Sequence, residues 1–161
     1  MRASAIALLL ALGGCQLSPV YSGGSSGAAA TLLADVEIAP IPERSGFLVR
    51  DRLVTRMQPS GSARYRLVVA LDDRIDGFGV RGDNSIIRER RTLRARYQLI
   101  DIASGDPVVD ATASADAGID VVTSPYAVVA AETSALERLS QNIADQIVAR
   151  LALFAREQPR A

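Results

Sequence analysis

The amino-acid sequence predicts an α+β fold: a two-layer sandwich with two helices packed on one face of a four-stranded, mostly antiparallel sheet. Three stretches, residues 64–75, 87–102 and 108–119, alternate apolar and polar side chains, as strands with one buried face do. Residues 43–57 and 125–156 instead repeat apolar side chains every three or four positions, as amphipathic helices do. With one more strand at residues 32–38, which would pair in parallel with a later one, the predicted order is β-α-β-β-β-α.

Prolines delimit the first two predicted elements. Leu32–Ile38 is rich in apolar and β-branched residues, and Pro40 and Pro42 end this predicted strand. Pro42 and Glu43 then suit the first turn of a helix, because proline needs no N–H partner there and a carboxylate complements the helix dipole. The buried side of this helix is predicted from apolar residues at a spacing of four, which are Val49, Leu53 and Met57.

Two turn segments connect the three alternating strands. Asp76–Asn84 is rich in glycine and is expected to form a long loop with Phe78 and Val80 at its tip, and Ala103–Pro107 is expected to close the second hairpin. Inward-facing residues are predicted to be Tyr65, Leu67, Val69, Leu71, Ile75, Leu93, Ala95, Tyr97, Leu99, Val109, Ala111, Ala113, Ala115, Ala117 and Ile119. The small alanines of the last strand leave space that a bulky element must fill.

The C-terminal helix is expected to fill that space. Ser124 provides an N-cap and Pro125 a first helical residue, while Ser134 with Glu137 offers a second possible start as a capping box. A helix over residues 125–156 would be about 45 Å long at about 1.5 Å per residue. Charged residues interrupt it too often for a membrane span, so it is expected to pack on the sheet. Its apolar face comprises Leu136, Leu139, Ile143, Ile147, Leu151 and Phe154.

The N-terminus predicts export. A single charge, Arg2, precedes the apolar run Ala3–Leu12 and two glycines, which is the order of a signal peptide. Leu12–Cys15 also resembles the lipobox of bacterial lipoproteins, in which the cysteine is lipidated; the alternative is an ordinary signal peptide that happens to contain a cysteine. We therefore expect a signal peptide at residues 1–14, a lipidated Cys15 with a flexible Gly/Ser tether at 15–30, and one periplasmic domain at 31–161.

Composition excludes several kinds of site. Eighteen basic residues balance eighteen acidic ones, so net charge favours neither nucleic acid nor a membrane surface as a partner. The chain contains no histidine, a single cysteine and only arginine as its basic residue. Imidazole–thiolate metal sites, cysteine nucleophiles, histidine bases and Ser–Lys hydrolases are thereby absent. We expect no enzyme, no metal and no cofactor.

The outward face of the predicted sheet is rich in arginine. Guanidinium groups match phosphate oxygens, so these side chains are candidates for contact with an anionic ligand. The alternative is that they form surface ion pairs with Asp72, Asp110 and Asp116, each contributing little. Seven arginines against four aspartates, Asp76 included, predict a surplus of about three positive charges. The candidates are Arg64, Arg66, Arg74, Arg88, Arg90, Arg94 and Arg96, with Phe78 as a possible contact at the loop tip.

Taken together, several segments resemble the lipopolysaccharide-assembly lipoprotein family LptE. They are Leu12–Cys15, Pro19–Tyr21, Val36–Arg44, Leu53–Met57, Arg94–Leu99, Ser124–Ala127 and Ala144–Leu151. The resemblance implies a lipid-anchored protein of the outer membrane, facing the periplasm, that plugs and helps assemble the β-barrel LptD and contacts lipopolysaccharide. In that role the seven arginines of the sheet face and Phe78 would be candidates for contact with lipopolysaccharide or with the barrel. The alternative is an accessory lipoprotein of another outer-membrane lipid-transport system, which would share the tether and the sandwich.

Overall fold

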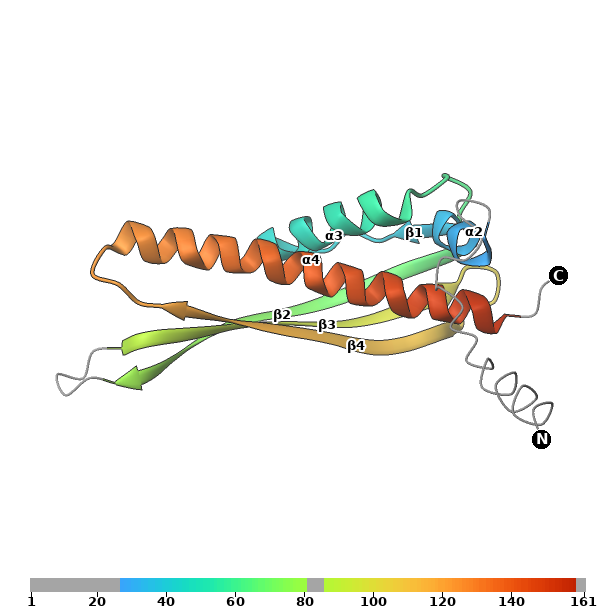
Figure 1. The fold of residues 1–161 in the computed structure, drawn as a ribbon. Helices are drawn as coiled ribbons and strands as arrows, with labels where there is room; N and C mark the ends of the chain where they lie inside the picture. The colour runs from blue at the N-terminus through green and yellow to red at the C-terminus, as the bar shows by residue number, and fades with distance from the viewer. Residues whose placement is uncertain (1–26, 81–85, 159–161) are drawn as a thin grey trace, which may run out of the picture.

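A computed structural model describes residues 27–80 and 86–158 (Figure 1). It confirms the α+β prediction, with three helices on one side of a four-stranded sheet. In chain order the elements are α2 (Ala28–Ala34), β1 (Val36–Ile38), α3 (Glu43–Met57), β2 (Tyr65–Val80), β3 (Ile86–Asp101), β4 (Pro107–Asp120) and α4 (Pro125–Glu157).

The sheet has the order β1-β2-β3-β4. β1 runs parallel to β2, with Val36 opposite Tyr65, as expected for the first strand. The other pairs are antiparallel: Tyr65 lies opposite Asp101, and Arg88 lies opposite Asp120. Because directly opposed residues point to the same side of a sheet, this register assigns every side chain to one of two faces.

One face is covered by the helices, and α4 extends along most of its length (Figure 1). The predicted inward residues of the strands do point to this side, where Leu67, Leu93 and Leu99 are completely buried. Helix α4 and strand β4 both contribute small side chains to the core, among them Ala144, Ala152 and Ala113. Small side chains let a long helix approach a sheet closely.

Residues Ala28–Ala34 form a helix, which corrects two predictions. The tether was expected to extend to residue 30 and the first strand to begin at Leu32; the helix instead includes residues 28–30 and ends at Ala34, and β1 comprises only Val36–Ile38. Alanine has the highest helix propensity, and Ala29, Leu32 and Leu33, at helical spacing, are buried, with α2 packing on α4. This docking makes a short helix stable.

Residues Asp76–Val80 belong to β2, whereas a loop was expected from Asp76 to Asn84. Their pairing continues to the end of the strand, where Phe78 lies opposite Arg88 and Val80 lies opposite Ile86. Cross-strand pairing with the long strand β3 therefore outweighs the low strand propensity of two glycines. The rest of the predicted loop, from residue 81 onward, lies outside the described residues.

Helix α3 agrees with its predicted limits and is held close to the preceding segment. At its end, Gln58 adopts a left-handed conformation, with φ 49°, directly before Pro59. At its start, Gly46 lies against Ile41, and a Cβ on Gly46 would come within 2.6 Å of the Ile41 carbonyl oxygen. Only glycine permits this approach.

Candidate functional site

The face of the sheet opposite the helices is the candidate site. Even-numbered residues of β2 and β3 point to it, and they include six of the seven predicted arginines. These six are Arg66, Arg74, Arg88, Arg90, Arg94 and Arg96; Arg64 immediately precedes β2. The strand alternation predicted from the sequence therefore does place these side chains on one open, solvent-exposed surface.

Three of these arginines form close pairs with carboxylates on neighbouring strands. The Arg66 Nε atom lies 3.1 Å from Glu37 of β1, and the Arg88 Nε atom lies 3.1 Å from Asp120 of β4. A third pair joins Arg96 to Asp110 at 3.1 Å. Each pair bridges two strands, which helps to fix the register but contributes little free energy at an exposed site.

Looser pairs involve two further arginines. Arg74 lies 3.7 Å from Asp72 on its own strand, and Arg64 lies 3.6 Å from Asp101. The carboxylate of Asp101 is mostly buried at the end of β3, so Arg64, its partner, lies at the margin of this surface. Five of the seven predicted arginines therefore have an acidic partner.

The predicted surplus of positive charge is wrong for the described residues. The register brings Glu37 and Asp120 onto this face in addition to the four aspartates considered from the sequence. Six carboxylates therefore accompany the six arginines, and the described part of the surface is neutral. The sequence count missed Glu37 because it lies on the short parallel strand, and Asp120 because it lies at the strand end.

The carboxylate of Asp110 lies in a hydrogen-bonding environment that shifts its pKa. Arg96 and Gln98 both donate hydrogen bonds to its carboxylate, with Gln98 Nε2 at 2.9 Å from Oδ2. These hydrogen bonds, that of Arg96 first, hold the pKa of Asp110 below its ordinary value, and the same contact raises the pKa of Arg96. Both groups are therefore charged throughout the physiological pH range.

Arg90 and Arg94 differ from the other arginines of the face. The guanidinium carbon of Arg90 lies 5.5 Å from the centre of the Phe78 ring, a cation–π contact that leaves its N–H groups free of carboxylates among the described residues. Arg94 lies between Asp72 and Ser114 in the register, without a hydrogen bond or ion pair to the described parts of the chain. These two residues retain the capacity to bind an anion.

The structure brings Phe78 to this face but in a different setting from the one predicted. It lies within β2 and is 40% exposed, with Arg90 over its ring. The sequence predicted it at a loop tip together with Val80, whose side chain is not among those described. Phe78 and Arg90 form one amphipathic contact, apolar at the ring and cationic at the guanidinium.

An ion pair on the opposite, helix-covered face was missed. Arg91 and Asp73 meet through two hydrogen bonds of 2.8 and 2.7 Å, and Arg91 also donates to the carbonyl oxygen of Glu132 in α4 at 3.0 Å. Both side chains are largely buried, being 13% and 15% exposed. The hydrogen bond to Asp73 raises the pKa of Arg91, and burial opposes that change.

A sequence signal for this pair existed. Asp73 follows Leu71, and Arg91 precedes Leu93, so both continue the apolar face of their strands with opposite charges. When two opposite charges occupy inward-facing positions of adjacent strands, they are expected to form a buried ion pair. Here the pair joins the β2–β3 hairpin to α4.

Clusters of metal ligands and membrane-spanning helices are both absent from the described residues. No group of three or more acidic or cysteine side chains that could hold a metal ion occurs between residues 27 and 80 or 86 and 158. Within the same residues, no helix is long and apolar enough to cross a membrane. Cys15, the predicted lipidation site, lies outside the described residues.

A long sheet face carrying matched charges, with helices packed on the opposite side, defines the class of α+β sandwiches that have one open polar face. The family model described as LptE, Lipopolysaccharide-assembly, matches residues 33–151, so the chain belongs to this family. Membership assigns the protein to lipopolysaccharide assembly, in a family of non-enzymatic lipoproteins.

Solved structures of bacterial lipoproteins share this fold. A candidate lipoprotein from Caulobacter crescentus CB15 is 27% identical, with a TM-score of 0.64 over 83% of this chain and 100% of that one. Rare lipoprotein B from Shewanella oneidensis shares the fold at 11% identity and a TM-score of 0.60, over 76% of this chain and 96% of that one. Lipoprotein B from Nitrosomonas europaea also shares the fold, at 12% identity and a TM-score of 0.59, over 75% of this chain and 83% of that one. None of the curated proteins compared with the chain matches it.

Proposed function

We propose that the protein is an outer-membrane lipoprotein, anchored through Cys15 and facing the periplasm, that plugs and helps assemble an LptD-type β-barrel. In this role it also binds lipopolysaccharide on its way to the cell surface. Family membership supports a role in lipopolysaccharide assembly. The open sheet face supports the proposed contacts with the barrel and with lipopolysaccharide. The observation that carries the proposal is a neutral polar face whose strands are joined by ion pairs. Of the arginines on this face, only Arg90 and Arg94 lack a carboxylate partner among the described residues.

The paired part of the face fits a barrel interior. Barrel lumens are polar, and a surface whose charges are already neutralised within itself can dock there without leaving isolated charges buried. Arg66, Arg88 and Arg96 keep their partners in such a contact. These arginines would contribute shape and hydrogen bonding to the barrel contact.

The two remaining arginines fit lipopolysaccharide. They stand four residues apart on β3, about 13 Å along the strand at roughly 3.3 Å per residue. Guanidinium groups without a carboxylate partner can each donate two hydrogen bonds to a phosphate group. Phe78 adds an apolar surface beside Arg90, as an amphipathic lipid requires.

The double variant Arg90→Gln/Arg94→Gln tests lipopolysaccharide binding. We expect normal folding, about tenfold weaker binding to purified lipopolysaccharide, and reduced sensitivity of the remaining binding to salt. The matched control is Arg66→Gln/Arg88→Gln, which removes the same charge from the same face at arginines that are already paired. Equal weakening by both variants would reduce the effect to overall charge and contradict a site at Arg90 and Arg94.

The barrel partner needs a separate experiment. A photo-crosslinking amino acid in place of Thr92, which lies between the two arginines on β3, should capture an LptD-type barrel in membranes. The control position is Gln141 on the exposed side of α4, away from the sheet. Capture of a different lipid-transport subunit through Thr92 would instead favour the accessory-lipoprotein alternative.

A further inference from the structure

Strand β4 forms one edge of the sheet, so one side of its main chain has no neighbouring strand among the described residues (Figure 1). The strand is 14 residues long. A long, exposed edge can pair with a strand of another chain, and proteins usually protect such edges for that reason. An edge of this length is therefore either protected or used.

The even-numbered residues of β4 direct their backbone groups to the open side. Val121, directly after β4, donates its N–H to the Ile87 carbonyl of β3 at 3.0 Å, so odd-numbered residues in the same register face β3. In an antiparallel pair, the N–H and C=O of one residue point to the same side, and successive residues point to opposite sides. The backbone groups of the even-numbered residues therefore have no partner in the sheet.

These residues are open to solvent. Every even-numbered residue from Val108 to Asp120 is exposed. One of their backbone groups is bonded by a side chain, because Gln146 Nε2 of α4 donates to the Ser114 carbonyl oxygen at 3.1 Å. This bond confirms the direction of the even-numbered groups and caps the middle of the edge. No other hydrogen bond to an even-numbered backbone group of β4 forms outside the sheet ladder among the described residues.

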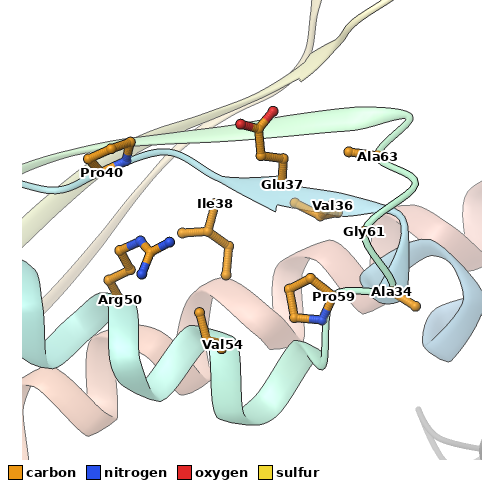
Figure 2. Close-up of a pocket in the computed structure, with 10 residues that line it drawn as sticks. All are labelled: Ala34, Val36, Glu37, Ile38, Pro40, Arg50, Val54, Pro59, Gly61 and Ala63. Carbon is orange, nitrogen blue, oxygen red and sulfur yellow. The ribbon is translucent and has the colours of Figure 1, made fainter.

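The opposite edge of the sheet, formed by β1, is closed by comparison. A groove of about 610 Å³ lies between β1 and α3, and Figure 2 shows Arg50 and Val54 of α3 facing the strand across it. Val36 and Ile38 are 1% and 5% exposed, so an incoming chain has no access to their main chain. A further strand could therefore pair with β4 but not with β1.

The exposed side of β4 is acidic. It carries Asp110, Asp116 and Asp120, and the strand contains no basic residue. Asp110 and Asp120 are paired with Arg96 and Arg88 of β3, whereas Asp116 has no hydrogen bond or ion pair with any described residue. A strand added beside β4 would bring its outward side chains next to these carboxylates, so basic residues there would be attracted and acidic ones repelled.

This charge distribution selects the occupant. A second copy of the chain pairing through its own β4 would bring two sets of three aspartates together, which is unfavourable. Residues 16–26 of this chain contain no basic residue, so they do not supply the complementary charge.

We propose that the open edge of β4 binds an extended, basic strand of another protein, antiparallel to β4, with an arginine or lysine beside Asp116. Main-chain hydrogen bonds give such a contact its affinity, and the side chains at alternate positions give it specificity. The contact lies at the edge of the sheet and does not depend on the function proposed for the open face.

The probe is the peptide acetyl-Arg-Val-Thr-Val-Thr-Val-Arg-amide, whose two arginines lie on one side of an extended strand. It is titrated into the ¹⁵N-labelled protein, expressed from the full sequence and purified in detergent. We expect slower hydrogen exchange at the amides of Asp110, Thr112 and Asp116, which face the open side, and less change at Ala111 and Ala113, which face β3. The control peptide has glutamate in place of both arginines and should bind about tenfold more weakly.

Three variants of the protein separate the contributions to binding. Asp116→Asn should weaken binding of the basic peptide about threefold, whereas the matched control Asp51→Asn, which removes an exposed carboxylate from α3, should not. Thr112→Pro removes an N–H that faces the open side, so it should abolish binding in a folded protein, because edge strands tolerate proline. Gln146→Ala removes the cap on Ser114 and should strengthen binding, an effect that a loss of stability would not produce.

Each of four results would overturn the proposal. One is unchanged exchange at Asp110, Thr112 and Asp116 with the basic peptide, which would leave the aspartates only as a barrier to pairing. Equal binding of the basic and acidic peptides is the second. The third is undiminished binding to Thr112→Pro; if circular dichroism shows that this variant is unfolded, equal binding to Asp116→Asn and Asp51→Asn takes its place. The fourth is a dimer in sedimentation equilibrium that the basic peptide does not dissociate and whose contacts lie on β4, which would make a second copy the occupant.

Discussion

Two arginine–aspartate pairs that involve β3 have opposite surroundings. Arg91 and Asp73 lie beneath α4 and are largely buried, whereas Arg96 and Asp110 lie on the open face. Burial removes water as an alternative partner, so loss of one member leaves an uncompensated charge only in the first pair. The same chemistry therefore has a structural role on one side of the sheet and a minor one on the other.

Arg91→Met should destabilise the fold by about 3 kcal/mol, because Asp73 would keep its charge beneath α4 without a partner. Urea denaturation monitored by circular dichroism measures the change in the free energy of unfolding. Removing both charges in Arg91→Met/Asp73→Leu should recover most of the loss, because no isolated charge remains. Arg96→Met is the exposed control and should leave the denaturation midpoint nearly unchanged. A midpoint for Arg91→Met equal to that of Arg96→Met would contradict a structural role for the buried pair.

The titration of Asp110 follows from its hydrogen bonds. Because its pKa in the folded protein lies below the ordinary 3.8, its contribution to stability is present above that pH and is lost as the pH falls through the folded pKa. Arg96→Gln removes the largest cause, so the Asp110 pKa should rise toward 3.8 in a carboxyl ¹³C NMR titration. Arg94 forms no hydrogen bond to Asp110, so Arg94→Gln should raise the Asp110 pKa less than Arg96→Gln does. A larger rise in Arg94→Gln would contradict Arg96 as the main cause of the shift.

At the scale of elements, α4 depends on one apolar side. Ile143 is completely buried between this helix and the sheet, so Ile143→Asp should destabilise the protein by several kcal/mol through an unpaired buried carboxylate. Asn142→Asp introduces the same group one residue earlier on the exposed side and should change the melting temperature little. Similar melting temperatures for the two variants would mean that α4 does not pack on the sheet through Ile143.

α2 shows why a short element escaped prediction. Its three alanines directly follow a Gly/Ser segment, and by composition alone the two look like one tether. Helical periodicity needs about two turns to be recognised, and α2 has seven residues. Its stability comes from contacts with α4, at the other end of the chain, which local sequence cannot indicate.

For the molecule as a whole, Cys15 is expected to determine location but not folding. Cys15→Ser should abolish acylation and release the protein into the periplasm in folded form, because the apolar core begins at Ala29. Mass spectrometry of the membrane and periplasmic fractions, with circular dichroism of the released protein, measures both outcomes. A serine variant that is still acylated and membrane-bound would exclude lipidation at this residue.

The sequence by itself determined the α+β class, both long helices and the orientation of most strand residues. These features follow from short-range periodicity, since the spacing of apolar residues reports which side of an element meets the core. The arginine-rich face was predicted for the same reason. Tertiary structure alone decided which arginines are paired, because Glu37 and Asp120 reach Arg66 and Arg88 only through strand register. It also decided that Arg91 and Asp73 are joined beneath α4 and that a groove lies beside β1, because both depend on contacts between elements distant in the chain.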